Sequence, residues 1–325
     1  IYTGQKDRLL FRVSYFKNRV NLEVFHALSD GAGAICFFQA LLIRYMTICY
    51  DIVWETLPRT APLNGLMDDS FSKHFAGGGL INVRMEKNQK AYRIRGTKFS
   101  DKRMGLVEGA MSVEKVLCEA RKHKVSLTAF LASLFIYSIG QEMNARGKKH
   151  PVVLNIPVNL RQYYKSVTVR NFFGLAAISC RLDKGSAEIE PIIQDVAKSF
   201  KKTLTRERLD ARANKLIAIE QNVVARIIPL PIKNGILRLF ANKALKNTTS
   251  AISNVGKINM PEEASPYIRQ FSVCTSASRP QMTLCSYGDR LVVSIASPFR
   301  ETEIQGCFFR LLSNSGIEIE LSSSI

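Results

Sequence analysis

The sequence predicts a mixed α/β fold, α+β in its layering, over a chain of 325 residues. Short runs with strand-like alternation, or with a continuous apolar character, are interspersed with longer stretches whose apolar residues recur at helical spacing. The two kinds of segment do not alternate regularly, which argues against a doubly wound sheet. The length is sufficient for two domains or for one large two-lobed domain with a substantial core.

The first part of the chain predicts a hairpin followed mainly by helices. Residues 9–16 and 20–25 read as strands joined by Lys17-Asn18-Arg19. A loop through Ser29-Asp30-Gly31 leads into an apolar helix over 33–50. Further elements expected here are an irregular connection over 55–80 that includes the triplet Gly77-Gly78-Gly79, a short strand over 92–99, and two helices capped by Ser112 and Ser126 that end near 123 and 143.

The polar stretch 144–150 (NARGKKH) is the expected boundary between a first lobe, residues 1–147, and a second lobe, residues 148–325. The second lobe opens on a buried strand over 152–158. The elements expected after it are a strand over 172–182, two basic amphipathic helices within 188–228, a helix over 232–246, strands near 250–254, 269–276, 281–286 and 290–296, a helix from 301 to about 312, and a strand over 317–321.

The cysteine and histidine content and the distribution of apolar residues argue against metal-binding and membrane-spanning proteins. The seven cysteines are dispersed without a C-x-x-C pair and there are only four histidines, which argues against a structural zinc or other metal site. Dispersed cysteines in odd number indicate reduced thiols, so a cytoplasmic location is expected. No run of 18 uncharged apolar residues is present, so no transmembrane segment is expected. The chain begins Ile1-Tyr2-Thr3 without a methionine and reads as a fragment.

The formal net charge of +19 indicates an anionic partner or a strongly solvated surface. Residues 73–103 hold nine Lys/Arg against two Asp/Glu, and residues 191–246 hold 12 against four. In the second segment the basic residues alternate with apolar ones at helical spacing, which is typical of a solvated helix face. A polyphosphorylated cofactor and an anionic membrane surface remain alternatives. Nucleic acid is disfavoured because no recognition motif or aromatic stacking platform accompanies the charge.

The six residues from His26 to Gly31 (HALSDG) carry the strongest chemical signal. His26 directly follows the second expected strand, and Asp30 lies four positions later. Neutral imidazole is the usual group that takes a proton from a hydroxyl near pH 7, so His26 is a candidate general base. Gly31 would let the backbone bend sharply or approach a ligand closely.

These residues, together with several separated segments, resemble the CoA-dependent acyltransferase superfamily of chloramphenicol acetyltransferase, plant BAHD acyltransferases and peptide-synthetase condensation domains. Within it, the chain is most similar to proteins described as alcohol acetyltransferases. The segments that carry the resemblance are Glu23–Gly31 (EVFHALSDG), Ser126–Leu131 (SLTAFL), Ile156–Arg161 (IPVNLR), Arg170–Gly174 (RNFFG), Ser253–Gly256 (SNVG) and the region from Glu301 to Ile317. Their order and approximate spacing match over essentially the whole chain.

The chain departs from the family pattern in two ways. Many members have two adjacent histidines, where this chain has Phe25-His26; the second, catalytic histidine is kept, and Phe25 is expected to pack in the core. The family also has a substantial segment before the strand that leads into the motif. We therefore expect part of the first lobe to be missing here.

The resemblance implies a two-lobed chloramphenicol acetyltransferase-like fold, with mixed sheets and a tunnel between the lobes. It implies transfer of an acyl group, in the simplest case acetyl, from the cosubstrate acyl-CoA to an alcohol hydroxyl, with no bound cofactor. A thioester is already activated, so a base is sufficient and no covalent acyl-enzyme is needed. The implied catalytic site contains His26 as the base, Asp30, Gly31 and Ser253.

The other roles in this site rest on the same resemblance. Asp30 would pair with Arg161 in a structural salt bridge, with Arg170 as the rival partner. Ser253 or Asn254 would donate a hydrogen bond to the oxyanion. Two alternatives remain open: an acyltransferase of the same fold that uses the phosphopantetheine thioester of an acyl-carrier protein, and a non-catalytic interaction module.

Overall fold

The computed structural model of the protein describes residues 9–55, 62–75, 90–101, 103–182, 188–221, 227–276 and 278–325. The chain divides into two compact units, each assembled from separate stretches of sequence. Unit 1 comprises residues 1–76, 158–174 and 258–269, and unit 2 comprises residues 77–157, 175–257 and 270–325. The units are discontinuous whereas the lobes 1–147 and 148–325 are continuous, and that division stays a prediction. The glycine triplet 77–79 lies outside the described residues.

Unit 1 opens with the predicted hairpin. Strands β1 (Phe11–Phe16) and β2 (Arg19–Val24) pair antiparallel from Phe11 opposite Val24 to Phe16 opposite Arg19, and Lys17 in the turn has a φ of 51°. Helix α1 (Gly31–Tyr50) follows. The short helices of this unit are α2 (Leu63–Leu66), α3 (Ser70–His74) and α6 (Arg161–Tyr164). The first two lie in the stretch predicted to be irregular.

Helix α1 is apolar along its length, with Arg44 as its only charged residue. Its buried residues are Gly33 and Met46, and β1 contacts it through the edge-to-face pair of Phe11 and Phe37, whose ring centroids are 5.4 Å apart. By length and composition α1 is able to cross a membrane, whereas we expected no such segment. A core helix of a soluble protein or a signal sequence has the same composition, so this finding assigns no membrane span.

An aromatic cluster in unit 1 surrounds the fully buried Phe172. The ring of Phe172 lies 5.0 Å from Phe71 and 6.1 Å from Tyr164, and Phe75 lies 4.9 Å from Tyr164. The T-shaped arrangement of these three pairs is the one that aromatic quadrupoles favour. The cluster therefore fixes the backbone of the stretch 158–174, on which the site described below depends.

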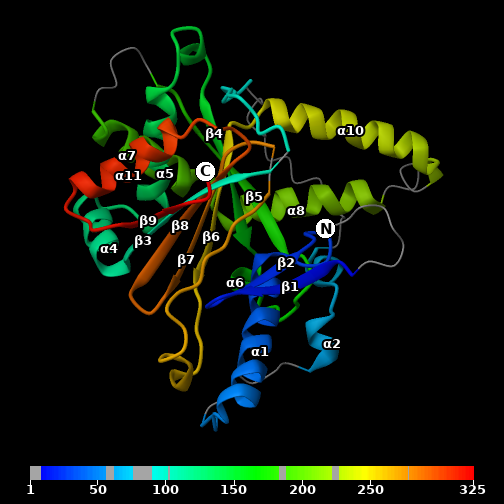
Figure 1. The fold of residues 1–325 in the computed structure, drawn as a ribbon. Helices are drawn as coiled ribbons and strands as arrows, with labels where there is room; N and C mark the ends of the chain where they lie inside the picture. The colour runs from blue at the N-terminus through cyan, green and yellow to red at the C-terminus, as the bar shows by residue number, and fades with distance from the viewer. Residues whose placement is uncertain are drawn as a thin grey trace. The chain divides into compact units, whose positions relative to one another are not determined.

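Unit 2 is built on one mixed seven-stranded sheet in the order β5-β4-β6-β7-β8-β3-β9 (Figure 1). β4–β6 and β6–β7 are parallel pairs, whereas β7–β8, β8–β3 and β3–β9 are antiparallel. The strands span Gly105–Ser112 (β3), Val152–Asn159 (β4), Phe173–Cys180 (β5), Ser250–Lys257 (β6), Gln281–Tyr287 (β7), Arg290–Ser297 (β8) and Glu320–Ser323 (β9). The ends of β4 and β5 belong to unit 1.

Four helices gather on one side of this sheet in Figure 1: α4 (Val113–Lys122), α5 (Leu127–Gln141), α7 (Glu190–Thr203) and α11 (Glu303–Asn314). α5 is buried nearly all round, and its Phe135 meets Phe308 of α11 edge to face at 6.3 Å. The predicted caps are confirmed, because Ser112 Oγ accepts from Lys115 N and Ser126 Oγ accepts from Ala129 N. The remaining helices of the unit are α8 (Arg206–Gln221) and α10 (Leu230–Lys246).

Two sequence-based expectations about this unit are wrong, and one strand was not predicted. Residues 92–99 form no strand; Lys98 makes only an isolated bridge to Phe299. The described residues of 269–276 also form no strand, because the carbonyls of Phe271 and Val273 accept from the side chains of Cys285 and Thr283 rather than from a neighbouring strand. Strand β3 was not predicted, although it lies between β8 and β9.

Candidate active site

His26 lies in the turn that joins β2 to α1, the place at which the sequence predicted it. The turn is closed by the bonds Phe25 N to Leu10 O and Leu28 N to Phe25 O, both 2.8 Å. His26 is exposed, and its ring lies 5.7 Å from the ring of Phe173. Among the described residues no hydrogen bond or ion pair engages its imidazole. Phe25 is 40% exposed, so the expectation that it packs in the core is wrong.

Asp30 caps α1 and is buried. Its Oδ1 accepts from Gly33 N at 3.0 Å and from Arg161 Nη2 at 3.1 Å. Its Oδ2 accepts from Arg161 Nη1 at 2.9 Å and from Phe172 N at 2.8 Å. Four donors occupy the roughly four acceptor positions of a carboxylate. Asp30 therefore fixes the motif and has no acceptor position left for a substrate proton.

Arg161 is the partner of Asp30 that the resemblance implied, and both belong to unit 1. Its remaining N–H groups donate to Thr168 O at 2.7 Å, to Asn159 Oδ1 at 3.2 Å and to Arg170 O at 2.6 Å. All five guanidinium donors thus have acceptors. The rival, Arg170, contributes its backbone carbonyl to this network.

The glycine that this site requires is Gly33 rather than Gly31. Gly31 is the first residue of α1, and its φ is not in the left-handed region, so the sharp bend expected there is absent. A Cβ on Gly33 would overlap Val169 O and Ser29 Oγ, and Ser29 Oγ itself donates to Val169 O at 2.6 Å. The close approach of α1 to residue 169 therefore depends on the missing side chain of Gly33. A close approach of Gly31 to a ligand stays a prediction.

Asn171 holds the backbone of the histidine turn. Its Nδ2 donates to His26 O at 3.1 Å and to Ala27 O at 3.4 Å. Asn171 belongs to the segment Arg170–Gly174 that carries part of the family resemblance, but its bonds to the histidine turn were not predicted. Both Asn171 and the amide of Phe172 are thus site residues that sequence reasoning missed, because a contact across 145 residues leaves no local pattern.

Ser253 and Asn254 lie on β6 in unit 2, whereas His26 lies in unit 1. Ser253 is half-buried and pairs with Thr283 across the β6–β7 ladder. Both polar atoms of the Asn254 amide are hydrogen-bonded: Nδ2 donates to Thr128 Oγ1 at 2.8 Å, and Oδ1 accepts from Gly256 N at 2.8 Å. The register shifts between Asn254 and Gly256, whose φ of 89° suits glycine. Of the two candidates, Ser253 is the one whose side chain makes no hydrogen bond among the described residues.

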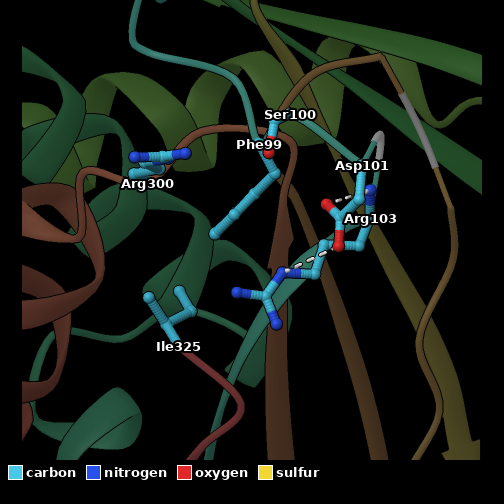
Figure 2. Close-up of a pocket in the computed structure, with 6 residues that line it drawn as sticks. All are labelled: Phe99, Ser100, Asp101, Arg103, Arg300 and Ile325. Atoms are coloured by element: carbon cyan, nitrogen blue, oxygen red, sulfur yellow. Dashed lines mark hydrogen bonds and ion pairs between the residues drawn. The ribbon is translucent and has the colours of Figure 1, made fainter.

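A pocket of about 350 Å³ lies in unit 2, and none of its lining residues is a predicted catalytic residue (Figure 2). Phe99 forms its centre, with the guanidinium groups of Arg103 and Arg300 at 4.8 and 5.9 Å from the ring centroid. Arg103 also pairs with Asp101 at 3.6 Å, shown dashed in Figure 2. Four of the six lining residues belong to the basic segment 73–103, and Arg103 is the basic one among them. Contact of this segment with the phosphates of CoA stays a prediction.

Comparisons with known proteins place this geometry in a known fold. No family model matches the chain, and no curated protein matches it significantly. Polyketide synthase associated protein 5 from Mycobacterium tuberculosis is similar in structure, with a TM-score of 0.56 and 14% identity, over 93% of this chain and 74% of that one. F. sporotrichioides TRI101 complexed with coenzyme A and T-2 has a TM-score of 0.55 at 11% identity, over 92% and 66%.

The epimerization domain from the third module of tyrocidine synthetase B is also similar, with a TM-score of 0.52 and 10% identity, over 91% of this chain and 68% of that domain. Identities this low show the fold and nothing finer. The chain accordingly has the fold of the CoA-dependent acyltransferase superfamily.

Proposed function

We propose that this chain carries the active site of an acyltransferase that moves an acyl group from acyl-CoA to an alcohol hydroxyl. The observation that carries the proposal is His26: an exposed imidazole, without a partner among the described residues, on a turn fixed from several sides. A group that must take a proton from a substrate needs free nitrogen atoms and a rigid support, and this turn provides both.

The chemistry follows from these residues. His26 takes the proton of the acceptor hydroxyl as its oxygen attacks the thioester carbonyl. The tetrahedral intermediate then collapses, the carbon–sulfur bond breaks, and His26 returns the proton to the departing thiolate. A general base of this kind contributes about 10²- to 10⁴-fold in rate. Ser253 is our proposed donor to the oxyanion.

Asp30 is a positioning residue in this mechanism. Its carboxylate has its acceptor positions filled by two backbone amides and Arg161, so it orients the turn and does not exchange protons. The similarity to TRI101, solved with coenzyme A, supports a CoA thioester as the donor. Acetyl is the simplest acyl group for a first assay.

A carrier-protein thioester is the second candidate donor. It is favoured by the similarity to an epimerization domain of a peptide synthetase and to a polyketide synthase associated protein. The net charge of +19 also suits an acidic carrier surface. Both donors present the same phosphopantetheine thioester, so the chemistry at His26 is the same for either.

The test is thiol release from acetyl-CoA in the presence of a panel of short and long alcohols. His26→Ala is compared with wild type and with His150→Ala, a control histidine in unit 2. We expect release in wild type and His150→Ala, and a loss of about 10²- to 10⁴-fold in His26→Ala. Release that does not depend on His26 contradicts the proposal.

The same assay distinguishes the donors. Release from an acetylated carrier protein, but not from acetyl-CoA, assigns the carrier-protein reaction. Protein that is folded by circular dichroism, yet inactive with every donor and acceptor, identifies the chain as a non-catalytic module of this fold.

A further inference from the structure

Helix α10 exposes large apolar side chains on most of its circumference. Ile232 is 58%, Leu237 56% and Leu239 72% exposed, and Leu230 and Leu245 are exposed as well. None of its residues whose side chains the structure describes is buried. A surface helix of a globular protein normally buries one apolar stripe against a core, and no described side chain of α10 is buried in this way. An exposed apolar surface of this kind is typical of a site that binds another molecule or a membrane.

Four of the six polar residues of α10 occupy positions on one face, whereas Lys233 and Lys243 occupy positions on the apolar side. Asn234, Arg238 and Asn242 recur at a spacing of four, so they lie above one another along the helix. Ile232, Ile236 and Leu239 follow a different face at the i, i+4, i+7 spacing. The helix therefore has a narrow polar face and a wide, mainly apolar one, and none of the described side chains on either face is buried.

Among the described residues, the backbone hydrogen bonds that join α10 to the rest of unit 2 lie at its C-terminal end. Its C-terminal end is held where Lys246 O accepts from Ala91 N and Thr249 N donates to Val153 O. In the middle of the helix, a Cβ added to Gly235 would meet nothing within 4 Å. In Figure 1, α10 extends from this attachment away from the sheet of its own unit. The exposed side chains along the helix are therefore accessible to another surface.

The basic residues of α10 indicate what kind of surface the helix binds. Residues 227–246 contain Lys233, Arg238, Lys243 and Lys246 and no acidic residue. The chain as a whole carries +19, so a second copy would be repelled. Nucleic acid would pair with the charges but leave the leucine and isoleucine side chains in water. An anionic lipid bilayer satisfies both, since apolar side chains enter the headgroup boundary while Lys and Arg remain at the phosphates.

We propose that α10 is a membrane-surface helix that binds the chain peripherally to anionic bilayers. Each basic residue near such a surface strengthens binding by about fivefold, and the exposed apolar side chains contribute the remainder. This inference does not depend on the acyl-transfer proposal, because α10 contains none of the residues assigned to that reaction.

Vesicle co-sedimentation tests the proposal, with vesicles of phosphatidylcholine alone and of phosphatidylcholine mixed with phosphatidylserine. We expect wild type to bind the mixed vesicles, to bind the neutral ones at least tenfold more weakly, and to be released by salt. Failure to bind the mixed vesicles, or equal binding to both, overturns the proposal.

Two pairs of variants locate the binding surface. Ile232→Gln with Leu239→Gln should weaken binding to mixed vesicles by tenfold or more, whereas Leu321→Gln, equally exposed on β9, should not. Lys233→Gln with Arg238→Gln should weaken it by about fivefold per charge, whereas Arg146→Gln with Lys149→Gln should not. All these side chains are at least partly exposed, so thermal unfolding checks that each variant folds. Equal loss in the α10 variants and their controls contradicts the assignment to α10.

Self-association is the competing explanation for the apolar surface. Sedimentation velocity without lipid gives the oligomeric state of wild type and of Ile232→Gln with Leu239→Gln. A monomer in both cases supports the membrane proposal. A wild-type dimer that dissociates in the double variant makes α10 a contact between copies and overturns it.

Discussion

Asp30 and Arg161, 131 residues apart in the sequence, form a bidentate ion pair with Nη–Oδ distances of 2.9 and 3.1 Å. The two side chains are only 7% and 12% exposed. Because Asp30 also caps α1, the pair ties the start of that helix to the stretch 158–174. His26 lies four residues before this attachment, so the position of the proposed base depends on a contact that no local sequence pattern describes.

Removing one partner of this pair should lower the stability of the folded protein. Arg161→Ala leaves the buried carboxylate of Asp30 with two backbone donors and no compensating charge. We expect a loss of about 3–5 kcal/mol in the free energy of unfolding, measured by urea denaturation. In Asp30→Asn with Arg161→Ala the loss should be smaller than the sum of the two single losses, because no uncompensated charge remains.

Arg170→Ala is the matched control for this prediction. Its side chain is exposed, and its contribution to the network is the backbone carbonyl, which alanine keeps. We expect a change within about 0.5 kcal/mol. A large loss in Arg170→Ala with a small one in Arg161→Ala would reverse the assignment of the pair.

Local patterns predicted the elements whose side chains repeat along a face. The hairpin, the helix after it and the Ser112 and Ser126 caps are present because alternation and capping depend on neighbouring residues. Strand β3 was missed because Gly105, Glu108 and Gly109 weaken its strand signal. Glu108 is buried and accepts from Ser294 Oγ at 2.8 Å, and Gly109 leaves space for the Phe309 ring. Both partners lie far away in the chain.

The two glycines of the motif region should respond oppositely to alanine. Gly33→Ala forces a Cβ into Val169 O and Ser29 Oγ, and backbone cannot move aside as a flexible side chain can. We expect a loss of several kcal/mol in unfolding free energy, or failure to fold. Gly31→Ala lies at an exposed first helical position without a positive φ, so we expect stability unchanged or raised by about 0.4–1 kcal/mol.

Thermal unfolding of both glycine variants checks this expectation. Equal destabilisation by the two substitutions would contradict it. If Gly31→Ala keeps its stability but loses acyl-transfer activity, the loss supports a close approach of this backbone to a substrate.

Alanine substitutions of Ser253 and Asn254 should have different effects on catalysis and on stability. Ser253→Ala removes only a hydroxyl from β6, so we expect an unchanged melting temperature and a fall in kcat of about 10²- to 10³-fold if it serves the oxyanion. Asn254→Ala breaks the bonds to Thr128 Oγ1 and Gly256 N and should lower the melting temperature. Steady-state kinetics and thermal unfolding of both variants give the comparison. A large fall in kcat in Asn254→Ala alone would transfer the role to the amide.

Cys285 makes stability fall at alkaline pH. It is buried on β7, and burial, with a smaller contribution from the charge of Glu108, raises the pKa of its thiol from 9.0 to about 12. Below pH 9 the thiol is neutral in both the folded and the unfolded chain. Between pH 9 and about 12 the unfolded chain releases this proton while the folded protein keeps it, so rising pH favours unfolding.

The comparison that isolates this thiol is Cys285→Ala against wild type in urea unfolding between pH 7 and about 10.5. We expect alanine to destabilise the protein at pH 7 through the lost packing, and the difference between the two proteins to narrow as pH rises, since only wild type loses the thiol contribution. Parallel curves would contradict a raised pKa. A thiol reagent at pH 8 gives an independent check: it should modify the exposed Cys36 and Cys49 in the folded protein and reach Cys285 only on unfolding.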